Sequence, residues 1–299
     1  MKASKIADML KYEYVGENDI EVDSIKMANV ALESDIAVAK SYEDIVVTKA
    51  KVILSNMAVV IGKCFIYTHE NIEMASIKIA QVINENQTVN GYENSINCVY
   101  GNNVSIGCGT KYGNYCVFGN NVVIGNNCVI GDCVSFGDGT IVGDNVIIDS
   151  GAQIGGKSNY HYVDENGVRK RFFGCGITQI ANGVEIGYNT VIQRGTFNNT
   201  LIGDNTKIGN LVEIAHDVVV GENCKIISQT GIAGGVIIGR NVVIYGQCGI
   251  KENVVIGDDV VIKGKSRVTK NIPAGLIISG MHTRENKKEL TLQVKLANI

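Results

Sequence analysis

His216 is the residue whose type and position best suit acid–base chemistry. The chain has 4 histidines, and this one stands two residues after Ile214, in a slot that neighbouring segments fill with Asn, Asp or Glu. An imidazole has a pKa of about 6.5, so on a rigid support it can accept a proton at neutral pH. A general base is therefore one interpretation of His216, and a surface histidine without a chemical role is the other.

A second candidate group lies in residues 156–179, where aromatic, basic and acidic side chains interrupt a regular pattern. Long insertions in repetitive folds project as loops, commonly on the binding face. Tyr160 and His161 are therefore candidates to close over a ligand, although a projecting loop with solvated charges explains the segment equally well. His69 and His282 lie outside the regular pattern and are interpreted as surface residues.

The elements that position these residues are set by a six-residue repeat. From 106 to 154 a bulky side chain recurs at every sixth position, and a mostly smaller one stands two positions before it. The bulky residues are Ile106, Tyr112, Phe118, Ile124, Ile130, Phe136, Val142, Ile148 and Ile154. This hexapeptide spacing predicts a parallel β-helix with one continuous core.

The repeat returns at Ile180, shifts by four residues through Asn198 and Asn199, and continues from 202 to 268. Three hexapeptides make one triangular coil of about eighteen residues, so that residues on successive coils stack. Corner sequences such as Gly119-Asn120-Asn121 tolerate the positive φ of tight turns. Repeats of this length are typical of left-handed coils, a handedness known from the class of fold.

We expect three segments in the chain. They are an N-terminal α/β domain at 1–97 that binds a nucleotide, a β-helix at 98–275 with the insertion at 156–179, and a C-terminal helical cap at 276–299. In the first segment the patterns predict helices at 3–12 and 72–82 and strands at 20–22 and 46–54. In the last segment they predict a helix at 284–296.

Composition and charge exclude only a few classes of protein. Residues 1–20 contain no apolar run of the length that a signal peptide or a membrane span needs, so we expect a cytoplasmic protein. The formal net charge is −3 without a basic block, which argues against nucleic acid as a partner. The 9 cysteines contain no C-x-x-C pair. Four of them occupy inward slots of the repeat and are interpreted as reduced core thiols, namely Cys116, Cys128, Cys224 and Cys248.

The segment 180–280 contains several distinctive motifs, namely Asn210-Leu211-Val212-Glu213-Ile214-Ala215-His216-Asp217, Gly231-Ile232-Ala233-Gly234, Gly246-Gln247, Val268-Thr269-Lys270 and Ser279-Gly280. With these motifs the segment resembles the UDP-3-O-acylglucosamine N-acyltransferases of lipid A synthesis. It extends to the N-terminal segment through Ile6-Ala7-Asp8-Met9-Leu10 and Lys40-Ser41-Tyr42.

The resemblance implies a left-handed β-helix with an N-terminal uridine-binding domain, assembled as a homotrimer with its sites between neighbouring subunits. It assigns the catalytic base to His216, which would take the proton of an amino-sugar amine that attacks a thioester. Further roles follow from the resemblance for other residues. Glu213 or Asp217 would orient the imidazole, Asn210 would contact the sugar, Tyr42 would stack on the nucleobase, Gly231 and Gly234 would leave room for a pantetheine arm, and Arg267 and Lys270 would meet donor phosphates.

Departures from the family pattern bear on the substrates. Glu213 stands where the family has Gln, and Asn253 stands where it has a second histidine. The chain ends at Ile299, before the long helices with which the family engages acyl carrier protein. We therefore expect an N-acyltransferase that uses acyl-CoA, with no permanently bound cofactor and no metal. The alternative within the class is lipid A-type N-acylation from acyl carrier protein.

Two other classes of protein remain in view. A hexapeptide carbonic anhydrase needs three histidines that converge on zinc, and only His161 and His216 lie near coil positions. A non-catalytic trimeric ligand-binding scaffold would keep the fold and lose the base. The sequence patterns do not indicate the acyl length, the position of the amine on the sugar, or whether the nucleobase is uracil or thymine.

Overall fold

The computed structural model describes residues 1–299 except 17, 58–62, 87–94, 281–283 and 298–299. The described residues form two compact units, Met1–Asn90 and Gly91–Ile299. The predicted boundaries at 97 and 275 stay predictions. None of the described helices combines the length and the apolar character that crossing a membrane requires.

The N-terminal unit is a small α/β fold with strands in the order β1-β5-β4-β3-β2. β1 runs antiparallel to β5, and the other neighbouring pairs are parallel. Apolar side chains of the two long helices and the sheet form its main core. Its elements are α1 (Ala3–Leu10), β1 (Glu13–Val15), β2 (Ser24–Met27), β3 (Asp35–Val38), α2 (Tyr42–Val47), β4 (Val52–Ser55), β5 (Cys64–Tyr67) and α3 (Ile72–Asn86).

Two strand predictions for this unit are wrong. At 20–22 the chain forms no strand, and only Glu21 makes an isolated bridge, to Lys2. At 46–54 the first residues belong to α2, because the Ser41 side chain and Asp44 form a capping box that starts a helix there. The predicted strand is therefore limited to β4.

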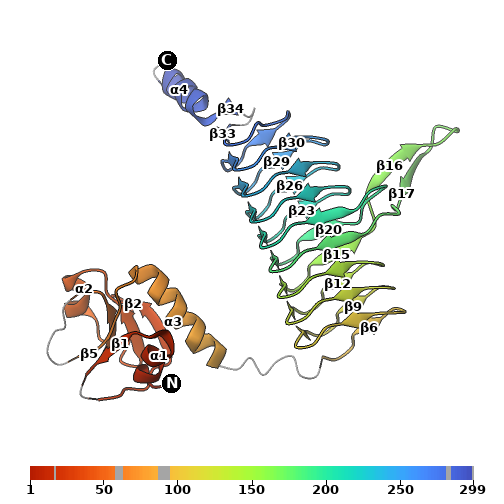
Figure 1. The fold of residues 1–299 in the computed structure, drawn as a ribbon. Coiled ribbons are helices and arrows are strands. Elements are labelled where there is room, and N and C mark those ends of the chain that lie inside the picture. The colour runs from red at the N-terminus through yellow and green to blue at the C-terminus, as the bar shows by residue number, and fades with distance from the viewer. Residues whose placement is uncertain (17, 58–62, 87–94, 281–283, 298–299) are drawn as a thin grey trace. The chain divides into compact units, whose positions relative to one another are not determined.

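The second unit is a parallel β-helix whose short strands lie on three faces (Figure 1). We name each face by its first strand. The β6 face contains β6 (Val99–Tyr100), β9 (Val117–Phe118), β12 (Ser135–Phe136), β15 (Gln153–Gly156), β20 (Val191–Gln193), β23 (Glu213–Ile214), β26 (Gly231–Ile232), β29 (Gly249–Ile250) and β32 (Arg267–Val268). The β7 face contains β7 (Ser105–Ile106), β10 (Val123–Ile124), β13 (Ile141–Val142), β18 (Thr178–Ile180), β21 (Thr200–Ile202), β24 (Val219–Val220), β27 (Ile237–Ile238) and β30 (Val255–Ile256).

The β8 face contains β8 (Lys111–Tyr112), β11 (Val129–Ile130), β14 (Ile147–Ile148), β19 (Glu185–Ile186), β22 (Lys207–Ile208), β25 (Lys225–Ile226), β28 (Val243–Ile244), β31 (Val261–Ile262), β33 (Ile277–Ser279) and β34 (Arg284–Glu285). The helix α4 (Asn286–Ala297) follows β34 and corresponds to the C-terminal helix that the sequence predicts.

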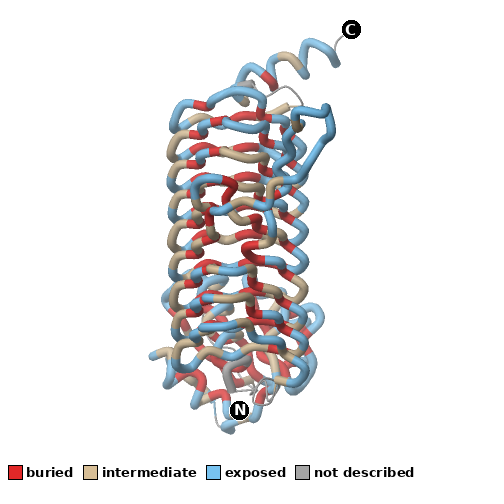
Figure 2. The backbone as a smooth tube through the Cα atoms, turned by 90° about the vertical axis from the view of Figure 1, so that its right-hand side faces the viewer, coloured by how far each residue is buried: buried red, intermediate tan, exposed pale blue. Residues whose placement is uncertain are grey.

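The core of the β-helix is the stack of inward side chains that the repeat predicts. Buried residues recur in coil after coil (Figure 2). Cys116, Cys128, Cys224 and Cys248 are buried and free, as predicted for small hydrophobic slots. At the corners, residues such as Asn121 adopt a positive φ of 56°.

The insertion at 156–179 forms an antiparallel hairpin rather than an irregular loop. Its strands are β16 (Tyr160–Val163) and β17 (Arg169–Phe172), and it projects from the stacked coils (Figure 1). Arg171 secures its base, because its guanidinium donates to the carbonyls of Ser158 at 2.8 Å and Lys157 at 2.7 Å. The hairpin therefore leaves the solenoid at a fixed point.

Candidate active site

The candidate site is centred on His216, at the corner between β23 and β24. Its side chain is 19% exposed, so it is neither buried in the core nor free in solvent. Its Nδ1 lies 2.8 Å from Oδ2 of Asp217. A carboxylate at this position favours the tautomer with the proton on Nδ1. The lone pair of Nε2 then remains available to accept a proton.

Asp217 is itself held firmly. Its Oδ1 accepts backbone N–H groups from Thr196 at 2.9 Å, Phe197 at 3.2 Å and Asn198 at 2.9 Å. Burial alone would raise the pKa of the carboxyl, but the bonds from His216 and from these backbone groups outweigh it, so the pKa is lowered from its ordinary value. The carboxylate therefore stays ionised and fixes the imidazole.

The four-residue shift in the repeat builds the loop that holds Asp217. The extra residues lie between β20 and β21, and their chain turns sharply at Gly195, where an added Cβ would be 1.6 Å from the carbonyl oxygen of Asn198. The turn directs successive N–H groups toward one oxygen of Asp217. The four-residue shift in the repeat thus forms a loop that holds Asp217, and Asp217 in turn holds His216.

Two neighbours pack directly on the imidazole. A Cβ added to Gly234, on the next coil, would lie 2.4 Å from Cε1 of His216, so a side chain at that position would displace the ring. The Tyr160 ring of the hairpin meets the imidazole edge to face, with centroids 5.6 Å apart at 87°. The imidazole is thus confined by a carboxylate, a glycine and an aromatic ring.

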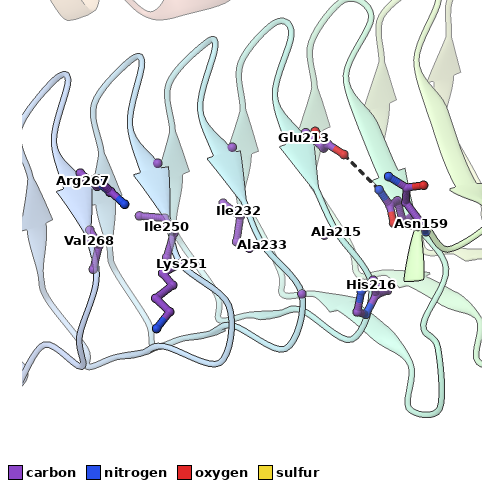
Figure 3. Close-up of a pocket in the computed structure, with 14 residues that line it drawn as sticks. Asn159, Glu213, Ala215, His216, Ile232, Ala233, Ile250, Lys251, Arg267 and Val268 are labelled. Carbon is purple, nitrogen blue, oxygen red and sulfur yellow. Dashed lines mark hydrogen bonds between the residues drawn. The ribbon is translucent and has the colours of Figure 1, made fainter. Parts of the chain in front are cut away.

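On one side of His216 a groove of about 590 Å³ runs along the β6 face (Figure 3). The outward residues of four successive strands there are Glu213, Gly231, Gly249 and Arg267. A Cβ added to either glycine would meet no atom within 4 Å, so the floor of the groove is open. We call this cavity the glycine groove. Lys251 also lines it, near the Arg267 end.

On the other side a cavity of about 660 Å³ extends along the β7 face. Its polar lining includes the amides of Asn198, Asn199 and Asn253, and Tyr160 lies at its edge. We call it the amide pocket. The two cavities share His216, Ala233 and Gly234, so both open on the same imidazole.

The structure brings together most, but not all, of the residues singled out from the sequence. Glu213, Gly231, Gly234 and Arg267 line the glycine groove, and Tyr160, Gly234 and Asn253 line the amide pocket. Asn210, His161 and Lys270 line neither cavity. Asn210 instead accepts the Tyr188 backbone N–H at 3.0 Å, His161 is exposed on the hairpin, and Lys270 is exposed at a corner.

Two further predicted roles can be compared with the geometry. Of the two acids expected to orient the imidazole, Asp217 contacts it, whereas Glu213 accepts a bond from Gln193 Nε2 at 3.0 Å (Figure 3). Tyr42 begins α2 in the N-terminal unit and is 61% exposed. His282 lies outside the described residues.

Sequence reasoning missed several residues of the site, including Asn159, Gln193, Lys251 and Glu252. Gln193 gave a signal, since it follows Ile192 where most coils have Gly or Asp. It is 6% exposed and its Oε1 accepts the Asn159 backbone N–H at 2.9 Å, which ties the hairpin base to the groove. Among the described residues, no three His, Cys, Asp or Glu side chains gather as a metal site would require.

The comparisons support a hexapeptide-repeat fold. The family described as "Bacterial transferase hexapeptide (six repeats)" matches residues 199–234, a stretch that contains His216 and Gly234. This agrees with the predicted repeat and confirms the β-helical fold class.

Part of the chain is also similar to named acyltransferases. UDP-3-O-acylglucosamine N-acyltransferases from Rickettsia bellii (strain RML369-C) and Rickettsia typhi (strain ATCC VR-144 / Wilmington) are 45% identical over 69 residues and 46% identical over 68 residues. The matches cover 23% of this chain and 20% and 19% of those relatives. The chain therefore matches about a fifth of the relatives' length, and the predicted resemblance is confirmed there.

Solved structures agree in fold. The UDP-N-acetylglucosamine O-acyltransferase (LpxA) of Moraxella catarrhalis superposes with a TM-score of 0.58 at 27% identity, covering 66% of this chain and 76% of that one. LpxA from Acinetobacter baumannii gives a TM-score of 0.57 at 25% identity, with 66% and 76% covered. The likeness thus extends to acyltransferases with both nitrogen and oxygen acceptors in their names.

Proposed function

We propose that this protein transfers an acyl group from a thioester to the amine of a nucleotide-linked amino sugar, with His216 as the base. The observation that carries the proposal is an imidazole that is held by Asp217 at Nδ1 and that lines two cavities. A two-substrate transfer needs such an arrangement, because both reactants must meet one base.

The reaction uses the imidazole twice. As the amine nitrogen attacks the thioester carbonyl carbon, Nε2 takes a proton from the nitrogen, and Asp217 stabilises the resulting imidazolium charge. When the tetrahedral intermediate collapses, the carbon–sulfur bond breaks and Nε2 returns the proton to the departing sulfur. The products are an amide and a free thiol, and His216 is regenerated.

The Gly234 N–H is a candidate to stabilise the oxyanion of that intermediate. At the same corner of earlier coils, the N–H of Asn102 donates to the Asn120 side chain at 2.9 Å, and that of Asn120 donates to Asp138 at 2.7 Å. The coil after Gly234 instead presents Glu252. No acceptor for the Gly234 N–H is found among the described residues, so it can serve a ligand.

The glycine groove suits the thioester donor. Its open floor leaves room for an extended pantetheine arm, and the cations of Lys251 and Arg267 lie at the end away from His216 (Figure 3). A pantetheine phosphate is common to coenzyme A and to acyl carrier protein, and it would meet those cations.

The relatives' names fit the lipid A-type alternative, UDP-3-O-acylglucosamine N-acylation, better than a different sugar. We adopt that acceptor class and keep both donors in the test. The proposed enzyme is a homotrimer, as the resemblance implies.

The function is tested by assaying transfer to UDP-3-O-acylglucosamine with acyl-CoA and with acyl carrier protein side by side. His216→Ala should lower kcat by about 10²–10⁴-fold with whichever donor is active. Unchanged turnover in that variant would remove the assigned role. Absence of transfer by the unmodified protein with both donors would instead favour a ligand-binding scaffold.

A paired glycine substitution separates the role of the site from that of the fold. Gly234→Ala should displace the imidazole and lower kcat about 10²-fold, because small misplacements of a catalytic group cost that much. Gly231→Ala, three residues earlier, meets no atom within 4 Å and should keep kcat, with any loss confined to KM for the donor because Gly231 stands on the floor of the groove. Equal kcat values for the two variants would contradict the proposed position of the imidazole.

A further inference from the structure

The two cavities that meet at His216 differ in charge. The glycine groove contains the cations of Lys251 and Arg267, and its acid, Glu213, is already bonded to Gln193. The amide pocket contains the acids Asp217 and Glu252, and no Lys or Arg is present in its described lining. An anionic ligand group therefore suits the groove, and a cationic group suits the amide pocket.

Glu252 occupies the same corner as His216, two coils further along the β-helix. The ladder of bonds from Gly235 N–H to the His216 carbonyl and from Asn253 N–H to the Gly234 carbonyl, both 3.0 Å, fixes this register. Neighbouring coils are about 4.8 Å apart, so Gly234 separates the two residues by one open position. The imidazole lies against Gly234. Glu252 is the acidic residue at the same corner of the following coil.

The fold does not use the Glu252 carboxylate. Corner acids elsewhere bond to the preceding coil, as Asp138 does to the Asn120 N–H at 2.7 Å and Asp258 does to the Arg240 N–H at 2.8 Å. Glu252 is exposed and forms no hydrogen bond or ion pair with any described residue. Its charge thus faces the amide pocket without a structural partner.

We infer that Glu252 receives the ammonium form of the acceptor in the amide pocket and makes the site select an amine over a hydroxyl. The inference rests on the proposed function and adds to it the pocket and the residue that choose the nucleophile. A carboxylate bonds more strongly to an ammonium than to a neutral hydroxyl. The bound ammonium releases one proton to solvent before attack, and the neutral amine gives its second proton to Nε2 of His216 as the carbon–nitrogen bond forms.

The rest of the pocket fits a sugar around that amine. The side-chain amides of Asn198 and Asn253 can donate and accept hydrogen bonds, as the hydroxyl groups of a sugar ring do. The Asn199 oxygen already accepts the Ile177 N–H at 3.0 Å, which leaves its NH₂ group as a donor. Val219 and Ile237 supply an apolar wall on the β7 face. Polar edges with an apolar side are the usual composition of a small-molecule site.

The test compares UDP-glucosamine and UDP-glucose, which differ by an amine and a hydroxyl on one carbon. Dissociation constants are measured by calorimetry for the full chain and for Glu252→Gln, each also in the His216→Ala background so that no turnover interferes. Glu252→Gln should weaken binding of UDP-glucosamine about tenfold, the lower range for a hydrogen bond to a charged group. Binding of UDP-glucose should stay unchanged.

Glu222→Gln is the matched control, because Glu222 is a half-exposed coil glutamate outside both cavities, 3.9 Å from Arg240. It should leave both constants unchanged. Equal weakening of both sugars by Glu252→Gln, or no weakening of either, would overturn the inference. A selective loss of UDP-glucosamine binding in a protein that transfers no acyl group would support the role of Glu252 while rejecting the proposed function.

Discussion

At the scale of single residues, Asp217 links the loop formed by the four-residue shift to the proposed base, His216. One of its oxygens is held by three backbone N–H groups of the loop between β20 and β21, and the other holds His216. The imidazole is therefore positioned by the Asp217 carboxylate as well as by the backbone of its own corner. The loop, the carboxylate and the base form one unit with a defined tautomer.

Replacing this carboxylate by an amide should reverse the tautomer. In Asp217→Asn the amide oxygen can still accept the backbone N–H groups, and the amide nitrogen then presents a proton to Nδ1 of His216. The imidazole proton moves to Nε2, which can no longer act as a base. We expect kcat to fall by about 10²–10⁴-fold, measured as steady-state turnover. Full activity would show that the tautomer is not set by Asp217.

The same substitution should change how stability depends on pH. The pKa of the Asp217 carboxyl is lowered in the folded state, so its contribution to stability is present above the unfolded pKa of about 3.9 and is lost as pH falls through the folded value. The difference in unfolding free energy between the protein and Asp217→Asn should therefore shrink below about pH 4. Urea denaturation at neutral and at acid pH measures it, and a constant difference would contradict the shift.

His216 could be found from the sequence because it breaks a corner pattern in a chain with few histidines. Gln193 gave a signal, but its contact with Glu213 depends on which coils stack across the four-residue shift. The eighteen-residue period places Glu252 two coils beyond His216, but only the structure shows that it lines a cavity. Spacing within one repeat shows which way a side chain faces. It does not show that Glu213 bonds Gln193, since that needs the register between coils.

At the scale of elements, the outward column of the β6 face determines where a ligand can lie. The core of the solenoid was predictable because each inward slot repeats its chemistry every six residues. The outward slots carry no such constraint, so two successive glycines at 231 and 249 mark a place where the fold would accept larger residues. Apart from β4, the short strands of the N-terminal unit were not predicted, because they contain too few residues to show a period.

Filling this column should obstruct the donor selectively. In Gly249→Val the new side chain would meet no atom within 4 Å at Cβ, so the fold should tolerate it, but it would occupy the floor of the groove. We expect kcat/KM for the acyl thioester to fall at least about tenfold, with unchanged binding of the UDP-sugar in the amide pocket. Ser135→Val, on the same face outside the groove, is the control.

At the scale of the whole molecule, the β7 face presents a column of aliphatic side chains to the outside. Val123, Ile141, Ile237 and Val255 are 38–47% exposed, and each stands at the outward position of its strand. Ile237 and Val219 also line the amide pocket, so a second copy packed on this face would complete that pocket. Gln179 interrupts this column at β18, but exposed apolar side chains gathered on one face are typical of an interface.

A charge placed in this column should therefore separate the proposed trimer. Ile141 lies outside both cavities. In Ile141→Arg, a neighbouring subunit could bury the new guanidinium only at a large desolvation cost. Light scattering should give three times the 32.1 kDa chain mass for the unmodified protein and a single chain for the variant, with transfer activity lost in parallel. Ile147→Arg, equally exposed on the β8 face, should keep the larger mass. A monomeric unmodified protein with full activity would show that one chain holds a complete site.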